Sequence, residues 1–149
     1  MFFLNYFTSS RQNEMREHLK KAGWGAARFL LELLEKDTFH ETLGGWGELY
    51  FLMDDDKPVA LATLTGQDCI RDESMVPWIG FVFTYPEYRR QRHLGRLLDH
   101  LAQEAARRGY PRVYVATDHV GVYERYGFSY FKNQVSIWGD DDRILVREL

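Results

Sequence analysis

The sequence predicts an α/β domain built on a mixed β-sheet, and three observations predict it. An apolar strand, a long amphipathic helix and a second apolar strand follow one another between Trp78 and Thr117. This pattern indicates two parallel strands joined by a right-handed crossover. Two apolar stretches flank the acidic turn 54–57, at the spacing of an antiparallel hairpin. The elements follow the order βααβββαβαββ, which is typical of an α/β domain.

Length and composition favour one domain over residues 1–149. No linker or repeat divides the 149 residues, and 15% of them are aromatic. Cys69 is the only cysteine, which excludes an internal disulfide and a cysteine-based metal site and agrees with a cytoplasmic setting; we expect no metal. The opening segment lacks the basic region of a signal peptide, and no apolar run reaches the roughly 20 residues of a membrane span. The net charge of −3 disfavours nucleic acid as a partner.

The first part of the chain predicts one strand and two helices. Phe2–Phe7 is an apolar strand. Ser9 and Gln12 match a capping box that begins a helix. A second amphipathic helix spans Ala26–Lys36, and a loop over Asp37–Gly47 follows it.

The middle of the chain predicts three strands. Glu48–Met53 and Pro58–Thr65 form the hairpin. A polar connection covers Gln67–Val76, and the next strand is Trp78–Phe83.

The second half predicts a long helix and three more strands. The helix begins at Leu94-Gly95, and Gly109 is well placed to cap it. Its apolar face consists of Leu94, Leu97, Leu98, Leu101, Ala102 and Ala105. The later elements are a strand over Arg112–Thr117, helical turns over Val120–Tyr126, and strands over Phe128–Trp138 and Arg143–Glu148.

The turn before the long helix carries a cluster of arginines. From Tyr85 to Arg112 there are seven basic and three acidic residues, against 12 basic and 19 acidic in the rest of the chain. The first N–H groups of a helix lack backbone partners and, with the helix dipole, form an anion site. The residues alone leave two interpretations open: a pyrophosphate site, or a solvated basic patch.

Three local patterns between Pro58 and Phe131 together resemble the GNAT (Gcn5-related) N-acetyltransferase family. Arg90-x-x-His93-x-Gly95 is similar to the family's acetyl-CoA loop, (Gln/Arg)-x-x-Gly-x-(Gly/Ala). It differs in that His93 replaces the middle glycine, and the segment that starts at Pro86 is one residue longer. The apolar strand Ile79–Phe83 precedes it. The third pattern, Tyr123-Glu124-Arg125-Tyr126-Gly127-Phe128, resembles the family's Tyr-Glu-Lys-x-Gly-Phe signature.

The resemblance implies a fold and an activity. The fold is a GNAT-like, mostly antiparallel mixed sheet with a central parallel strand pair splayed for the cofactor, and helices on both faces. The activity is transfer of an acetyl group from acetyl-CoA to a primary amine of a small molecule or peptide, by direct attack in a ternary complex. The implied cofactor-binding residues are Phe81, Val82, Phe83, Arg89, Arg90, Gln91, Arg92, His93, Leu94, Gly95 and Arg96.

The implied chemistry assigns roles to these parts. The loop N–H groups and guanidinium groups hold the pyrophosphate, and the strand edge pairs with the pantetheine arm. A backbone N–H near Val82 or Phe83 stabilises charge on the thioester oxygen. The resemblance makes Tyr123 the proton donor to the departing thiolate. The alternative is a tyrosine that only packs in the core.

No spacing singles out the base that receives the amine proton. The candidates are Glu48, Asp68, Asp72, Glu73 and His119. His119 follows the end of a predicted parallel strand, where ligands gather in α/β sheets, and is the second catalytic candidate.

The acceptor site is expected at Gly23–Glu32 and Asp37–Gly47, since the first two helices usually shape it in the family. Candidate pocket aromatics, which also suit an ordinary core, are Trp24, Phe29, Trp46, Tyr50 and Trp78. The acidic surplus favours a cationic amine as acceptor. We expect no membrane partner and a monomer or homodimer. Two other functions stay open: a non-catalytic acyl-CoA-binding or regulatory module, and a domain whose arginines dock an acidic protein.

Overall fold

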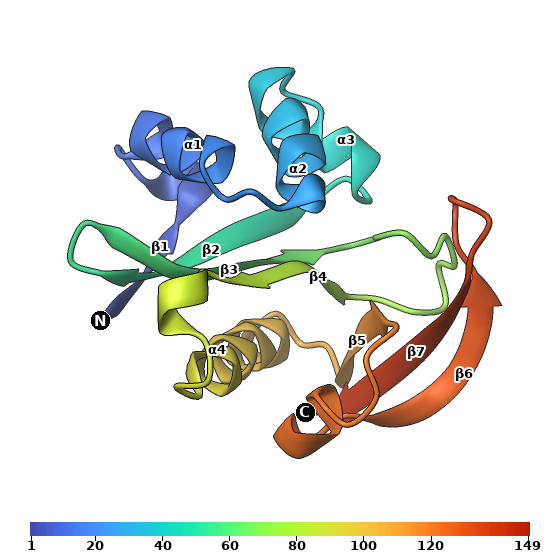
Figure 1. Ribbon diagram of the computed structural model, residues 1–149. Coiled ribbons are helices and arrows are strands. Elements are labelled where there is room, and N and C mark those ends of the chain that lie inside the picture. The colour runs from blue at the N-terminus through green and yellow to red at the C-terminus, as the bar shows by residue number, and fades with distance from the viewer.

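The computed structural model describes all residues from Met1 to Leu149 and contains one seven-stranded sheet with helices on both faces (Figure 1). The strands are β1 (Phe2–Asn5), β2 (Gly47–Asp54), β3 (Lys57–Thr65), β4 (Trp78–Thr84), β5 (Arg112–Thr117), β6 (Ser129–Val135) and β7 (Asp141–Glu148). The helices are α1 (Gln12–Lys20), α2 (Gly25–Glu35), α3 (Phe39–Thr42) and α4 (His93–Arg107). The predicted α/β fold class is confirmed.

The sheet has the strand order β1-β2-β3-β4-β5-β7-β6 and is antiparallel except at one junction. β2 and β3 form the predicted hairpin. β4 and β5 are parallel, and only two residue pairs join them, Trp78 with Tyr114 and Ile79 with Val115. Beyond these pairs the two strands separate, as expected for the splayed central pair.

The helices form a layer on each face of the sheet: α1, α2 and α3 lie on one side and α4 on the other (Figure 1). Side chains alternate across a strand, so neighbouring residues of β2 enter different cores. Phe51 packs in the core beneath α1 to α3, whereas Leu52 packs in the core beneath α4. Because both faces of the central strands are buried, these strands are apolar at almost every position.

The N-terminal segment differs from the prediction in two places. β1 ends at Asn5, because Asn5 Oδ1 accepts the Phe7 N–H at 3.2 Å and the chain enters a 3-10 turn. α1 begins at Gln12, three residues after the predicted cap. Ser9 Oγ accepts the Arg11 N–H at 2.9 Å, and the Gln12 amide donates to the carbonyl of Tyr6 instead of closing a capping box. Such local side-chain bonds compete with helix caps.

Two later elements also have different bounds. The predicted loop 37–47 contains α3, whose Phe39 is buried in the core beneath α1 to α3. β6 ends at Val135, because the Ser136 N–H donates to the carbonyl of Asp140 and closes the turn to β7. The long helix agrees with its periodicity, and Gly109 takes the left-handed φ of +92° that a helix C-terminus favours. None of the helices has the length and apolar character that a membrane crossing requires.

Candidate functional site

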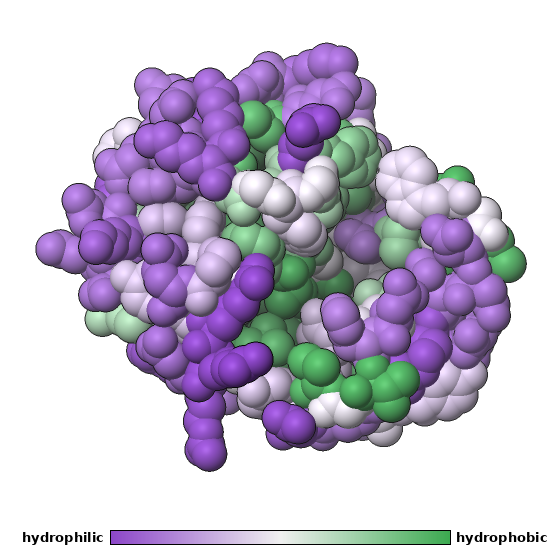
Figure 2. All heavy atoms as spheres, viewed as in Figure 1, coloured by the Kyte–Doolittle hydropathy of each residue, from purple (hydrophilic) through white to green (hydrophobic).

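A cavity of about 690 Å³ opens where β4 and β5 separate. Figure 2 shows this face hollowed, with a hydrophobic floor between hydrophilic flanks. Both strands line it, β4 through Ile79 to Val82 and β5 through Val115 to Thr117. The region expected to shape an acceptor site lines it as well, through residues before and within α2 and α3. The polar lining consists of Asp68, Cys69, Arg71, Asp118, His119 and Tyr123, with Thr42 and Thr117.

A β-bulge shapes the β4 side of the cavity. Thr63 of β3 pairs with Gly80 and Leu61 pairs with Phe83, so Phe81 and Val82 together face one residue of β3. Phe81 has a φ of +50°, which is uncommon for a bulky side chain and costs on the order of 1–3 kcal/mol. Bulges of this kind re-aim the backbone beside functional sites. The bulge removes Phe81 and Val82 from the β3 ladder at the lip of the cavity.

The arginine-rich turn leads from β4 into α4. Arg89, Arg90, Gln91, Arg92 and Arg96 are all exposed. Arg90 and Arg92 have left-handed φ values of +63° and +66°, and no side chain caps the start of α4. The first N–H groups of α4 are therefore left without an intrahelical or capping partner, beside four guanidinium groups. Two of these are already engaged: the Arg89 Nε–H donates to the Thr84 carbonyl at 2.9 Å, and the Arg96 guanidinium donates to Met1 Sδ at 3.3 Å.

Three predicted loop residues are not exposed. Leu94 is half-buried, and His93 is buried at the first position of α4, with its Nε2 3.3 Å from Gln91 Oε1. Gly95 is buried against the ring of Tyr126: a Cβ at Gly95 would lie 2.7 Å from Tyr126 Cε1. Gly95 thus allows the 3-10 turn Tyr123–Tyr126 to pack on the start of α4. The acetyl-CoA loop pattern, which contains Gly95, and the C-terminal pattern, which contains Tyr126, meet at this contact.

Tyr123 lines the cavity and is only 6% exposed. Its ring packs edge-to-face on Phe128. Burial raises the pKa of the Tyr123 phenol to about 12. The hydroxyl is therefore protonated over the whole neutral range, in the state that a proton donor requires. Packing and proton donation are compatible here.

His119 lies at the rim of the same cavity, after the end of β5. Its backbone is fixed on both sides: the His119 N–H donates to Thr117 Oγ1 at 3.0 Å, and its carbonyl accepts from Arg143 at 2.9 Å. The side chain is exposed. The structure therefore brings together Tyr123, His119 and the strand residues Phe81 and Val82.

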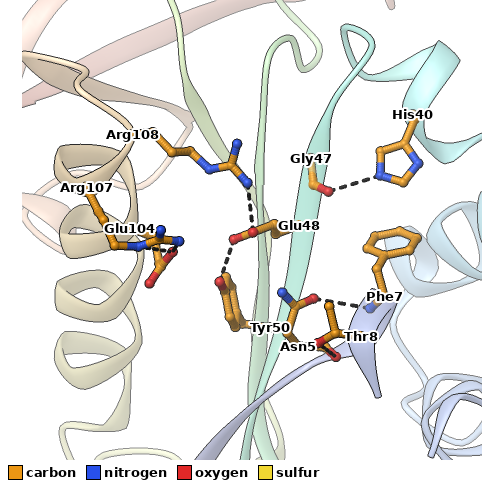
Figure 3. A network of polar contacts seen from close by, with 10 residues as sticks. All are labelled: Asn5, Phe7, Thr8, His40, Gly47, Glu48, Tyr50, Glu104, Arg107 and Arg108. Atoms are coloured by element: carbon orange, nitrogen blue, oxygen red, sulfur yellow. Dashed lines mark hydrogen bonds and ion pairs between the residues drawn. The ribbon is translucent and has the colours of Figure 1, made fainter. Parts of the chain in front are cut away.

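Of the remaining base candidates, only Asp68 reaches the cavity. Glu48 lies elsewhere, in a network at the far end of α4 (Figure 3). It accepts from the Tyr50 hydroxyl and, at 2.8 Å, from Arg108. Asp72 accepts from the backbone and side chain of Ser74, and Glu73 is exposed.

The aromatic candidates divide in the same way. Trp24 and Phe29 line the cavity, whereas Trp46, Tyr50 and Trp78 do not. Trp78 is fully buried and its indole N–H donates to the Met75 carbonyl at 2.7 Å. Ile137 and Trp138, from the turn before β7, also line the cavity and were not among the predicted residues. No local pattern marks them, because only the return of the last hairpin brings them to the site.

The hollow therefore combines a strand edge beside a bulge, a protonated phenol and a half-buried carboxyl group, and the strand that lines it leads into the uncapped, arginine-rich start of α4. Cys69 also lines it, and burial raises the pKa of its thiol to about 12, so no thiolate nucleophile is present at neutral pH. No group of three or more His, Cys, Asp and Glu side chains is placed to hold a metal ion.

Comparison with known proteins gives a consistent result. The family model described as "Acetyltransferase (GNAT) domain" matches residues 34–131. A comparison with curated proteins finds no match. A solved GNAT-family acetyltransferase from Desulfovibrio desulfuricans is 17% identical, with a TM-score of 0.71 over 99% of this chain and 98% of that one.

Two other solved structures are similar. A GNAT-family acetyltransferase from Elizabethkingia anophelis with acetyl-CoA bound is 17% identical, with a TM-score of 0.60 over 74% of this chain and 82% of that one. The aminoglycoside 6'-N-acetyltransferase from Enterococcus faecium is 15% identical, with a TM-score of 0.68 over 99% and 97%. At these identities the likeness shows the fold.

Proposed function

The chain belongs to the GNAT acetyltransferase family, and on that premise we propose that it transfers an acetyl group from acetyl-CoA to a primary amine of a small molecule. The observation that carries the proposal is the separation of β4 from β5 beyond Ile79, beside a strand that leads into an uncapped, arginine-rich helix start. The second end of the cavity, between α2 and the last hairpin, would receive the amine.

The residues present fit coenzyme A, which supplies the acetyl group as a thioester. Its diphosphate suits the free N–H groups at the start of α4 together with Arg90, Arg92 and Arg96. Its amide-containing arm suits the open edge of β4 at Phe81 to Phe83, in the way that a peptide adds to a sheet edge. His93 and Gly95 are buried and support the turn from within.

The bulge and Tyr123 would act on the reacting group. A backbone N–H at Val82 or Phe83 would stabilise the negative charge that develops on the acyl oxygen. The Tyr123 hydroxyl would give its proton to the departing sulfur, and its raised pKa keeps that proton available up to alkaline pH.

Three observations support direct transfer to a small acceptor. The thiol of Cys69 is protonated at neutral pH, so an acetyl-cysteine step has no nucleophile ready. The cavity volume of about 690 Å³ is within the range of small-molecule sites. Some similar structures are aminoglycoside acetyltransferases, which act on a small molecule.

Two measurements test the proposal. Acetyl-CoA at about 100 times its Kd should stabilise the protein by about 2.7 kcal/mol, which corresponds to a rise in Tm of several degrees. Thiol release in the presence of a panel of primary amines should then exceed the rate without amine. Absence of a thermal shift would contradict the cofactor site. A thermal shift without thiol release from any amine would instead identify a non-catalytic acyl-CoA-binding module.

A further inference from the structure

Asp68 and Gly80 line the cavity beside the bulge and, with the buried Thr63 next to them, form a polar notch. Asp68 Oδ1 is buried and has no hydrogen-bond partner. The same holds for Thr63 Oγ1, on a residue that is 0% exposed. Both atoms point at Gly80: a Cβ there would overlap Asp68 Oδ1 and lie 3.1 Å from Thr63 Oγ1. Buried polar atoms without partners are rare, and here two of them converge on one backbone position.

The notch is directly next to the place where the acyl group would lie. Gly80 immediately precedes Phe81, the residue of the bulge with left-handed φ. Asp68 and Gly80 both line the cavity. A ligand ammonium group that reaches the Asp68 carboxylate from the cavity would supply a hydrogen bond with charge complementarity.

The rest of the acceptor end is apolar and aromatic. The ring centroid of Phe29 in α2 lies 6.0 Å from that of Phe81 and 5.7 Å from that of Trp138. Phe29 therefore joins the bulge to the last hairpin. Trp24 stacks on Phe83, with the ring centroids 4.9 Å apart. Trp138 is 61% exposed, which leaves much of its ring free at the mouth of the cavity. The hydrophobic surface inside the hollow is visible in Figure 2.

Few charges accompany these rings. The ionisable groups of the cavity are Asp68, Cys69, Arg71, Asp118, His119 and Tyr123, and Asp142 faces Asp68 and Cys69 from β7. A ligand with several amino groups would meet only two carboxylates in the cavity and one opposing guanidinium. The site thus suits one ammonium group on an apolar body.

We infer that the acceptor is a primary amine carried on an apolar, ring-bearing body, and that Asp68 takes the proton from its ammonium group. The inference rests on the proposed function. Gly80 provides the space in which the carboxylate approaches the β4 backbone. The walls formed by Trp24, Phe29 and Trp138 hold the body.

The step balances as follows. Asp68 removes one proton from the ammonium group, and the freed lone pair forms a bond to the acetyl carbon. The carbon–sulfur bond breaks and its electron pair leaves with the sulfur, which receives the proton of Tyr123. The second proton lost by the nitrogen restores the Tyr123 hydroxyl, and Asp68 releases its proton to solvent. The products are an amide, a thiol and one proton.

The pKa of Asp68 suits this role. Burial raises this pKa to about 6. Hydrogen bonding from the backbone and the thiol of Cys69, and the charge of Arg71, oppose the rise, and Asp142 adds to it. The carboxyl group is therefore a base at neutral pH and is more basic than an ordinary aspartate. Tyr123 and Cys69 have pKa values near 12 and do not titrate in the same range.

An amine panel tests the substrate class. Thiol release from acetyl-CoA is measured with 2-phenylethylamine, ethylamine, spermidine and kanamycin. Burial of the phenyl ring should raise kcat/KM for 2-phenylethylamine at least about tenfold above that for ethylamine. Spermidine and kanamycin should also be at least about tenfold poorer than 2-phenylethylamine. A polyamine or aminoglycoside as best acceptor would overturn the substrate class and leave the acetyltransferase function standing.

Asp68→Asn tests the base, with Glu73→Gln as a matched control that removes a carboxylate from the same connection outside the cavity. In the wild type, kcat/KM should rise through pH 6 and then stay level up to the pKa of the amine, about 10 for an alkyl ammonium group. In Asp68→Asn only neutral amine reacts. Its kcat/KM should be at least about a hundredfold lower at pH 7 and climb about tenfold per pH unit. Glu73→Gln should follow the wild type.

Gly80→Ala keeps the carboxylate but crowds the notch, so it should lose activity as Asp68→Asn does while still binding acetyl-CoA. This second variant decides the matter if Asp68→Asn does not fold. The pH profile of kcat/KM is also measured for His119→Gln, because a limb that arises from the imidazole disappears in this variant. An Asp68→Asn profile equal to that of Glu73→Gln, or a pH 6 limb that disappears in His119→Gln, would overturn the role of Asp68. Absence of thiol release from all four amines would count against the proposed function itself.

Discussion

The ring of Tyr126 occupies the space that a side chain on Gly95 would need, with Tyr126 Cε1 2.7 Å from the position of a Cβ. The contact joins the start of α4 to the turn that carries Tyr123. Two segments about 30 residues apart in sequence are thereby fixed relative to each other.

Gly95→Ala tests this contact. In an open helix position, Ala is favoured over Gly by about 1 kcal/mol. At Gly95 the ring must move, so we expect a lower Tm and weaker binding of acetyl-CoA. Gly25→Ala, at the start of α2 with nothing within 4 Å of the new Cβ, is the control and should keep or raise Tm. A Gly95→Ala protein more stable than the wild type would show that the contact is not tight. Differential scanning calorimetry measures both variants.

Tyr123→Phe removes the proposed proton donor and keeps the packing on Phe128. We expect turnover to fall by about a hundredfold, in the range of a general acid. The Kd for acetyl-CoA, measured by calorimetry, should change less than about threefold. Because the pKa of the phenol is about 12, the wild-type activity should show no descending limb from this group below pH 10. Unchanged turnover would exclude Tyr123 from the chemistry.

Replacing Arg90 and Arg92 together by Ala tests the diphosphate site. Both side chains are exposed and neither donates a hydrogen bond within the protein, so the free energy of unfolding should be almost unchanged. The Kd for acetyl-CoA should rise about ten- to a thousandfold, since charge-assisted hydrogen bonds contribute on the order of 1.5–3 kcal/mol each. Arg28→Ala on α2 removes an exposed arginine from outside the turn and should bind normally. Equal affinity in all three proteins would reduce the arginine cluster to a surface patch.

Asp68→Asn should also change the stability, in a pH-dependent way. The folded pKa of about 6 is above the unfolded value near 4, so the stabilisation of the protonated form is present below pH 4 and is lost as the pH rises through 6. The asparagine side chain is neutral at every pH, so the variant keeps this stabilisation above pH 6. The variant should therefore match the wild type near pH 4 and exceed it above pH 6, by on the order of 2–3 kcal/mol. Urea unfolding at several pH values measures the difference, and Glu73→Gln should show none.

Glu48→Gln should lower stability without affecting catalysis. In the network of Figure 3, Glu48 accepts from the Tyr50 hydroxyl and from Arg108. The Arg108 guanidinium also lies 4.5 Å from the Trp46 ring centroid. Hydrogen bonds to a charged group contribute about 1.5–3 kcal/mol, so we expect a loss of that order. Turnover should stay within about twofold. A large loss of turnover in a folded variant would return Glu48 to the list of catalytic residues.

The sequence was sufficient for the parts of the fold that rest on local pattern. The apolar stripe of α4, the β2–β3 hairpin and the strand–helix–strand unit depend on residues close together in the chain, and each was predicted. The capping box at Ser9 does not form because the Ser9 and Gln12 side chains bond other backbone groups, the Arg11 N–H and the Tyr6 carbonyl, which no sequence pattern indicates. α3 was missed because a single turn leaves too short a period to recognise.

The site was predictable only in part, for a related reason. The β4 strand, the arginine turn and Tyr123 have sequence signatures. Asp68 was one of five candidate bases and no local pattern favoured it; only the fold places it in the cavity. Trp138 had no signature at all, because it reaches the cavity through the return of the last hairpin. Residues that approach from distant segments are assigned by topology, which local periodicity does not encode.

The short junction between β4 and β5 also bears on how the chain assembles. The sheet consists of one block of four strands and one of three, and only two residue pairs connect them. Each block contains a hairpin of strands adjacent in sequence, β2–β3 in one and β6–β7 in the other, whose loop closure is inexpensive in entropy. α4 packs on both blocks through one apolar face. We therefore expect the blocks to dock late, and a folding intermediate with either block unformed would retain secondary structure and contain no pocket.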